Sequence, residues 1–207
     1  MADSARPNGK LTTGGVGGIL LCAAFALFLV SGGLGVGGMQ AAGGLGLIGM
    51  ILLIGGGICA AMGFFGLGKI YGGTNGIGGV FTLLMGVMPV VLLLVGIIFA
   101  STASAETLSE GGARAAGGIM MVFGIVFIVS IALSGILGGI GIMGAKAALA
   151  KPAGILLLVG GIGALLSILT MFNVLPASIA GILGYVVSGG FAAGFLLSGL
   201  AMFSERA

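Results

Sequence analysis

Three glycine-rich segments match patterns that bind phosphate in other proteins, but each lies in an apolar stretch. Residues 63–69 read Gly-Phe-Phe-Gly-Leu-Gly-Lys, which fits the GxxxxGK pattern of a phosphate-binding loop. That loop needs a preceding strand and a serine or threonine after the lysine to hold magnesium, whereas Ile70 follows Lys69 here. Residues 44–49 and 139–144 fit GxGxxG, but a dinucleotide site needs a strand–turn–helix unit with a later acidic residue. We therefore predict no nucleotide site and no cofactor.

Other groups that carry chemistry are scarce. The chain has no histidine, and its two cysteines, Cys22 and Cys59, both lie in apolar segments without further ligands nearby, so we predict neither a metal site nor a secreted disulfide framework. A free cysteine in such surroundings is typical of a small apolar filler. No nucleophile–base pair stands out, and we predict that the protein is not an enzyme.

One polar segment contains the only acidic pair between apolar stretches. Glu106, Glu110 and Arg114 are each four residues apart within the segment 101–115, so on a short helix they would form one charged face. Two exposed carboxylates without a pocket make a poor catalytic site. We interpret these residues as a solvated face of an outer loop or a docking point for a partner.

The composition indicates an integral membrane protein. Of 207 residues, 59% are hydrophobic and 5% are charged, against about 25% charged residues in soluble domains. The 47 glycines follow no collagen period, and glycine within apolar spans lets helix backbones approach closely. The net charge of +3 is small and the basic residues are dispersed, so nucleic acid is not an expected partner.

Six stretches reach the roughly 20 apolar residues that a membrane-spanning helix needs. Their predicted bounds are 14–36, 41–67, 77–100, 116–144, 153–172 and 179–203. The fold class is therefore an all-α integral membrane protein, a compact bundle of about six transmembrane helices. A single domain over 14–203 is flanked by short tails at 1–13 and 204–207. The even spacing is compatible with three tandem helical hairpins, and whether these are true internal repeats stays open.

The basic residues predict the orientation. With six spans, both termini and the second and fourth links lie on one side of the membrane, and that side collects Arg6, Lys10, Lys69, Lys146, Lys151 and Arg206. Lysine and arginine are enriched in cytoplasmic loops. We therefore expect both termini to be cytoplasmic, and the short loops and charge bias suggest a bacterial inner membrane.

Pairs of small residues four positions apart suggest where helices pack. Residues i and i+4 share one helix face, and two small residues there form a flat groove for a neighbouring helix. Such a face can serve packing within the bundle or contact with other subunits, and replacing Gly135 or Gly190 by leucine should disrupt assembly more than insertion. The pairs retained as candidate packing sites are Gly14/Gly18, Gly33/Gly37, Gly135/Gly139, Ala177/Gly181 and Gly190/Gly194.

Two further features bear on function. Pro89 lies in mid-span three residues after Gly86, which predicts a kink that is either static or a hinge. No charged residue lies deep in any span, so proton-coupled transport and voltage sensing lack their usual carriers.

The preferred interpretation is a non-catalytic structural or accessory subunit that contacts lipid and other membrane proteins. The alternative is a channel or transporter for a small or weakly polar solute.

Overall fold

The computed structural model describes residues 8–33, 39–102, 110–172 and 174–205. These residues form six α-helices, each long and apolar enough to cross a membrane. The prediction of an all-α bundle of six membrane-spanning helices is confirmed. The helices are α1 (Asn8–Gly33), α2 (Met39–Tyr71), α3 (Thr74–Thr102), α4 (Glu110–Met143), α5 (Ala150–Met171) and α6 (Ala177–Ser204).

The apolar spans agree with the predicted ones within four residues, except for the first. That span runs from Gly9 to Ser31, earlier than the predicted 14–36. Sequence reasoning placed Lys10 outside the membrane, whereas the helix includes it. A lysine near a helix end can extend its ammonium group to the membrane surface while its methylenes stay among apolar groups.

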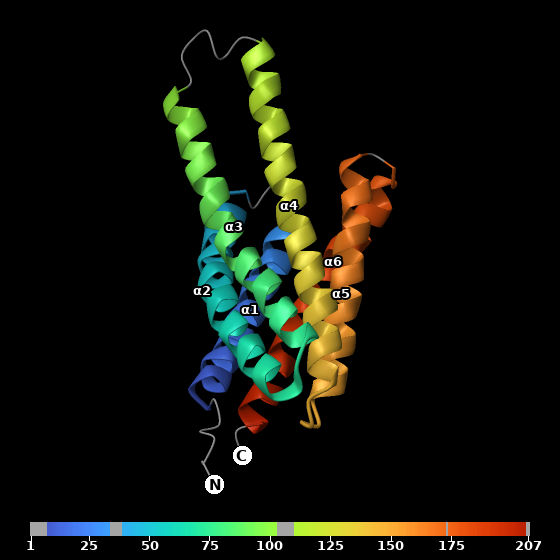
Figure 1. Cartoon of the computed structure of the whole chain (residues 1–207). Coiled ribbons are helices and arrows are strands. Elements are labelled where there is room, and N and C mark those ends of the chain that lie inside the picture. Colours follow the sequence, from blue (N-terminus) through green and yellow to red (C-terminus); the bar gives the residue numbers. More distant parts are fainter. Residues whose placement is uncertain (1–7, 34–38, 103–109, 173, 206–207) are drawn as a thin grey trace.

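The six helices form a closed ring. Each helix packs against the preceding and following helices in the chain, and α6 packs against α1. Figure 1 shows that α1 begins and α6 ends at the same end of the bundle as the α2–α3 and α4–α5 links. We call this end the lysine end, because it holds Lys10, Lys69, Lys146 and Lys151.

Local sequence signals set the tight links at the lysine end. Gly72, between α2 and α3, has a φ of 84°, a left-handed conformation that favours glycine. Its N–H donates a hydrogen bond to the carbonyl of Gly68. This bond caps the last turn of α2. Pro152 lies in the first turn of α5, where its missing N–H costs nothing. Within the spans, all-helical backbone is expected because lipid offers no hydrogen bonds to an open chain.

Burial is confined to the part of the ring nearer the lysine end. The last buried residues of α1, α3 and α5 are Phe25, Pro89 and Ala164, and burial in α2, α4 and α6 starts at Gly49, Ser130 and Gly190. Beyond these points no side chain that the structure describes is buried. The helices α3 and α4 continue furthest and project past the others (Figure 1). We call residues 90–102 of α3 and 110–129 of α4 the α3–α4 arm.

Aromatic side chains fill the middle of the ring. Phe25 of α1 stacks on Phe191 of α6 with ring centroids 5.0 Å apart, and Phe195 lies 5.7 Å from Phe191. Phe64 of α2 and Met85 of α3 complete the packing with 0% exposure. Because lipid is as apolar as these side chains, close packing rather than the hydrophobic effect holds the helices together here.

Candidate functional site

A glycine lies against a glycine of the neighbouring helix at all six interfaces of the ring. A Cβ atom added at Gly57 would lie 2.7 Å from the Cα of Gly86, and one added at Gly18 would lie 2.8 Å from the Cα of Gly199. Both distances are shorter than real Cβ contacts, so only glycine allows these helices to approach so closely. The six contacts are Gly14–Gly63, Gly57–Gly86, Gly78–Gly138, Gly139–Gly154, Gly160–Gly190 and Gly18–Gly199.

Most of the predicted packing residues lie inside this ring. Gly14 lies against Gly63 of α2 and Met202 of α6, whereas the nearest neighbours of Gly18, four residues later, belong to α6. Gly135 and Gly139 of α4 both contact α5, and Gly190 and Gly194 of α6 contact it from the other side. A leucine at position 135 or 190 would therefore disturb the chain's own bundle before it disturbed any assembly.

Of the remaining predicted packing residues, Gly33, Ala177 and Gly181 lie toward the other end. Gly181 faces open space, since a Cβ there would meet nothing within 4 Å, and Gly184 is equally open. Gly33 is the last residue of α1 and Ala177 is the first of α6. Gly37 lies outside the described residues. This face of α6 is therefore available to a molecule other than the chain itself.

The predicted kink residues lie where α3 leaves the ring. Gly86 contacts Gly57 of α2, and α3 continues as an unbroken helix through Pro89 to Thr102. Pro89 is also the last buried residue of α3. The proline thus marks the boundary between the packed part of the helix and the arm, and a kink there stays a prediction.

The charged residues of the predicted orientation gather at one end. Lys69, Lys146 and Lys151 are exposed there and Lys10 is half-buried, while Arg6 and Arg206 lie outside the described residues. At the opposite end, Glu110 is the first residue of α4 and Arg114 lies one turn later, so the loop predicted over 101–115 is helical at both of its ends. Glu106 lies outside the described residues.

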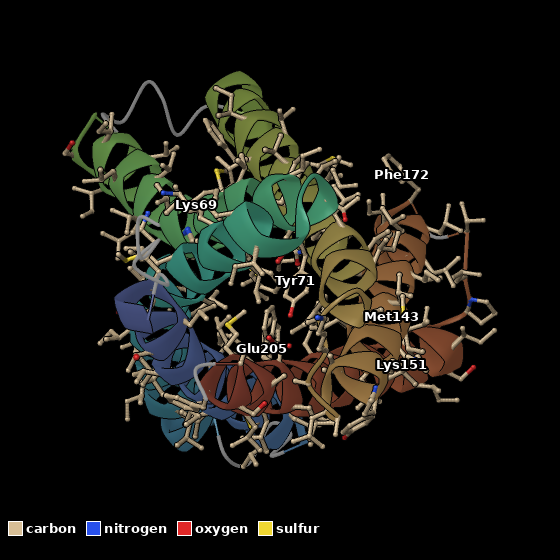
Figure 2. The ribbon with its side chains drawn as sticks, turned by 60° about the horizontal axis from the view of Figure 1, so that its bottom comes forward. Lys69, Tyr71, Met143, Lys151, Phe172 and Glu205 are labelled. Carbon is tan, nitrogen blue, oxygen red and sulfur yellow. The ribbon has the colours of Figure 1, made fainter. Side chains whose placement is uncertain are left out.

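Glu205 joins three parts of the bundle at the lysine end. It follows the last residue of α6, and its carboxylate accepts a 2.7 Å hydrogen bond from the Tyr71 hydroxyl and another, also 2.7 Å, from the N–H of Ala147. Tyr71 ends α2, and Ala147 lies in the α4–α5 link. Figure 2 shows Tyr71 and Glu205 within the ring, with Lys69 and Lys151 further out. Sequence reasoning treated Glu205 as part of a tail and missed this contact.

Removing this carboxylate should loosen the lysine end. We expect Glu205→Ala to destabilise the bundle by about 2 kcal/mol, because two hydrogen bonds to a charged acceptor are lost. Unfolding in mixed detergent micelles measures the effect. Ser204→Ala is the matched control, since the Ser204 hydroxyl bonds only to the carbonyl of Ala201 in its own helix. Equal losses in the two variants would show that the contact is unimportant.

Polar side chains inside the ring are paired with one exception. The Thr82 hydroxyl of α3 lies 2.7 Å from that of Ser134 in α4, which links the two helices. Asn75 donates from Nδ2 to the carbonyl of Gly141, and its buried Oδ1 has no hydrogen-bond partner among the described residues. That oxygen packs against Gly141, where a Cβ would lie 2.5 Å away. These hydrogen bonds link α3 to α4.

The segments that match phosphate-binding patterns are helical. Residues 63–69 lie within α2, and Gly63 contacts Gly14 of α1. Residues 44–49 lie in α2 and residues 139–144 at the end of α4. Cys22 and Cys59 are half-buried free thiols. Within the described part of the chain, no three His, Cys, Asp or Glu residues are grouped so that they could hold a metal ion.

Among the described residues, the α3–α4 arm and the groove beside Gly181 and Gly184 between α1 and α6 are surfaces that the contacts of the ring leave uncovered. Comparison with known proteins adds no family to this description. No protein-family model, no curated protein and no solved structure matches the chain. The geometry described above therefore identifies the chain as a polytopic membrane protein with six apolar helices.

Proposed function

We propose that the protein is a non-catalytic structural or accessory subunit of a membrane assembly, and that its α3–α4 arm packs against another membrane protein. The observation that carries the proposal is that none of the arm side chains that the structure describes is buried. Several large aliphatic residues there are more than half exposed, among them Leu94 at 53%, Ile98 at 60% and Val122 at 61%. Phe127 packs against the core of the ring, and the other described side chains of the arm are half-buried or exposed.

The glycines of the arm support a protein partner over lipid alone. At each interface of the ring, glycine permits a close helix contact. On the arm, a Cβ at Gly96, Gly117 or Gly118 would meet nothing within 4 Å. Glycine costs a helix about 1 kcal/mol relative to alanine, and in membranes its compensating advantage is the close approach of a second helix. A helix of another chain supplies that contact.

Two parts of the bundle favour this role over conduction or catalysis. The stacked Phe25, Phe191 and Phe195 fill the middle of the ring, where a channel or transporter would need a path. The polar groups inside the ring bond to one another or to the backbone. The exposed lysines support an orientation with both termini in the cytoplasm, which in a bacterium means the inner membrane.

Site-directed photo-cross-linking in native membranes tests the arm. In a variant carrying Cys22→Ala and Cys59→Ala, a benzophenone is attached to Val122→Cys. The control is Ile155→Cys on α5, which is 55% exposed and, like Val122, lies five residues from the end of its span. We expect position 122 to cross-link to another polypeptide and position 155 to lipid only, with adducts identified by mass spectrometry.

Three results would contradict the proposal: no polypeptide adduct at position 122, equal adducts at both positions, or a lone monomer in native mass spectrometry after mild extraction. Solute-dependent flux through the purified protein in proteoliposomes would instead support the channel or transporter.

A further inference from the structure

A groove of about 330 Å³ opens between α1 and α6, on the side of the ring opposite the α3–α4 arm. It lies beyond the last buried residue of α1 and before the first buried residue of α6, in the half away from the lysine end. A Cβ at Gly181 or Gly184 would meet nothing within 4 Å, so the space beside them is free. The lining residues are Phe28 and Leu29 of α1 with Ala180, Gly181, Gly184, Tyr185 and Ser188 of α6.

The groove follows α6 for about two turns. Ala180 and Ser188, which lie at its two ends along α6, are eight residues apart, which corresponds to about 12 Å. A groove of this length and of about 330 Å³ has room for a hydrocarbon chain.

Two hydroxyl groups in the groove have no hydrogen-bond partner among the residues that the structure describes. The Tyr185 and Ser188 side chains make no hydrogen bond within the described part of the chain, and Tyr185 is 53% exposed. The other hydroxyls well inside the spans are all bonded, to a backbone carbonyl or to each other. These are Thr82, Ser130, Ser134, Ser167 and Ser198. An unpaired hydroxyl surrounded by lipid is unfavourable, so an occupant with a hydrogen-bonding group is favoured.

The depth of the two hydroxyls in the membrane and the absence of charged residues in the groove limit the kind of molecule that can bind there. Tyr185 and Ser188 lie eight and eleven residues into α6, about 12 and 16 Å from its first residue. A charged headgroup at that depth costs several kcal/mol, and no Lys, Arg, Asp or Glu lines the groove to offset it. A phospholipid keeps its headgroup at the surface, where it cannot reach these hydroxyls.

We propose that the α1–α6 groove binds one molecule of a neutral lipid whose hydrocarbon chain carries a carbonyl or hydroxyl group. The chain lies along Gly181 and Gly184 against Phe28. The polar group forms hydrogen bonds with the hydroxyls of Tyr185 and Ser188. This site is separate from the arm, so its failure would leave the proposed function untouched.

Retention of decylubiquinone, a neutral probe with carbonyl groups and a ten-carbon chain, tests the site. The purified protein is equilibrated with the probe, passed through gel filtration, and the retained quinone is quantified. We expect wild-type protein to retain one equivalent and Gly184→Leu, whose Cβ has nothing within 4 Å and whose side chain extends into the groove, to bind at least about ten-fold more weakly. Tyr185→Phe, which loses one hydrogen bond, should bind about five-fold more weakly. Gly55→Leu, at an open position on α2, is the control and should bind like wild type.

Several results would overturn the proposal. Unchanged retention in Gly184→Leu would place the probe elsewhere, and unchanged retention when Tyr185→Phe is combined with Ser188→Ala would remove the role of the hydroxyls. Equal competition by decane or by an anionic phospholipid would show that no polar group is selected at this depth. Finally, p-benzoylphenylalanine at position 28 should attach a lipid mass in native membranes, whereas a polypeptide adduct would assign the groove to a protein partner.

Discussion

Replacing Gly57 by alanine should destabilise the bundle by about 2–3 kcal/mol, the cost of inserting a methyl group where nothing can move aside. The added Cβ would lie 2.7 Å from the Cα and 3.0 Å from the N of Gly86, and 3.2 Å from the carbonyl oxygen of Thr82. All three are backbone atoms, so no side-chain rotation relieves the clash and α2 must separate from α3. Reversible unfolding in mixed detergent micelles, followed by circular dichroism, measures the loss.

Gly55 provides a matched control two residues away in the same helix. A Cβ there would meet nothing within 4 Å. Alanine at either position gains the same intrinsic helix preference, about 1 kcal/mol over glycine. Gly55→Ala should therefore be neutral or slightly stabilising, and the difference between the two variants isolates the helix contact. Similar behaviour of both variants would mean that the glycine contacts do not hold the ring together.

Truncation of Phe191 should have the other large effect. Its ring is fully buried and stacks on Phe25, and a Cβ at Gly135 of α4 or Gly160 of α5 would lie within about 3 Å of it. The side chain thus touches three helices besides its own. We expect Phe191→Ala to cost about 3–4 kcal/mol, because the cavity it leaves is bordered by packed backbone that cannot collapse. The same unfolding measurement applies.

Phe172 serves as the control for this truncation. It follows α5 and is 54% exposed, so Phe172→Ala should change stability by no more than about 0.5 kcal/mol. If Phe191→Ala were as mild, the aromatic stack would not be the centre of the bundle. In that case the argument that a filled ring favours a structural role over conduction would also lose its basis.

The number and type of the elements could be predicted because lipid allows few alternatives. Six apolar stretches of sufficient length must be helices, since an open chain in lipid leaves its backbone groups without partners. The alternation of basic links predicted that Lys69, Lys146 and Lys151 share one end, as the structure shows. The first span was predicted to start too late. Hydropathy places the boundary of a span at its polar residues, whereas the helix α1 includes Lys10, Thr12 and Thr13 before the apolar stretch.

The sequence did not reveal which glycines carry the contacts. With 47 of them, every span offers several pairs at four-residue spacing, and the pattern alone does not distinguish them. Gly14 and Gly18 share a face in an isolated helix, but in a closed ring each helix has a neighbour on either side. Gly14 contacts both α2 and α6, whereas the nearest neighbours of Gly18 belong to α6. Gly57, Gly78, Gly154 and Gly199 gave no signal of their own. The groove was equally hidden, because Phe28 and Tyr185 are far apart in the sequence.

The sequence by itself determined that the chain lies in lipid and that it forms six apolar helices, because both depend on the transfer of single segments between water and lipid. Tertiary structure decided what depends on neighbours. Packing of α6 against α1 closes the ring. Across its six interfaces twelve glycines form backbone contacts, and Glu205 lies beside Tyr71. The ring leaves the arm and the groove uncovered. Between helices that are apolar on every side, only the fit of backbones and side chains distinguishes one arrangement from another. That fit depends on two helix surfaces together, so it cannot be read from either segment alone.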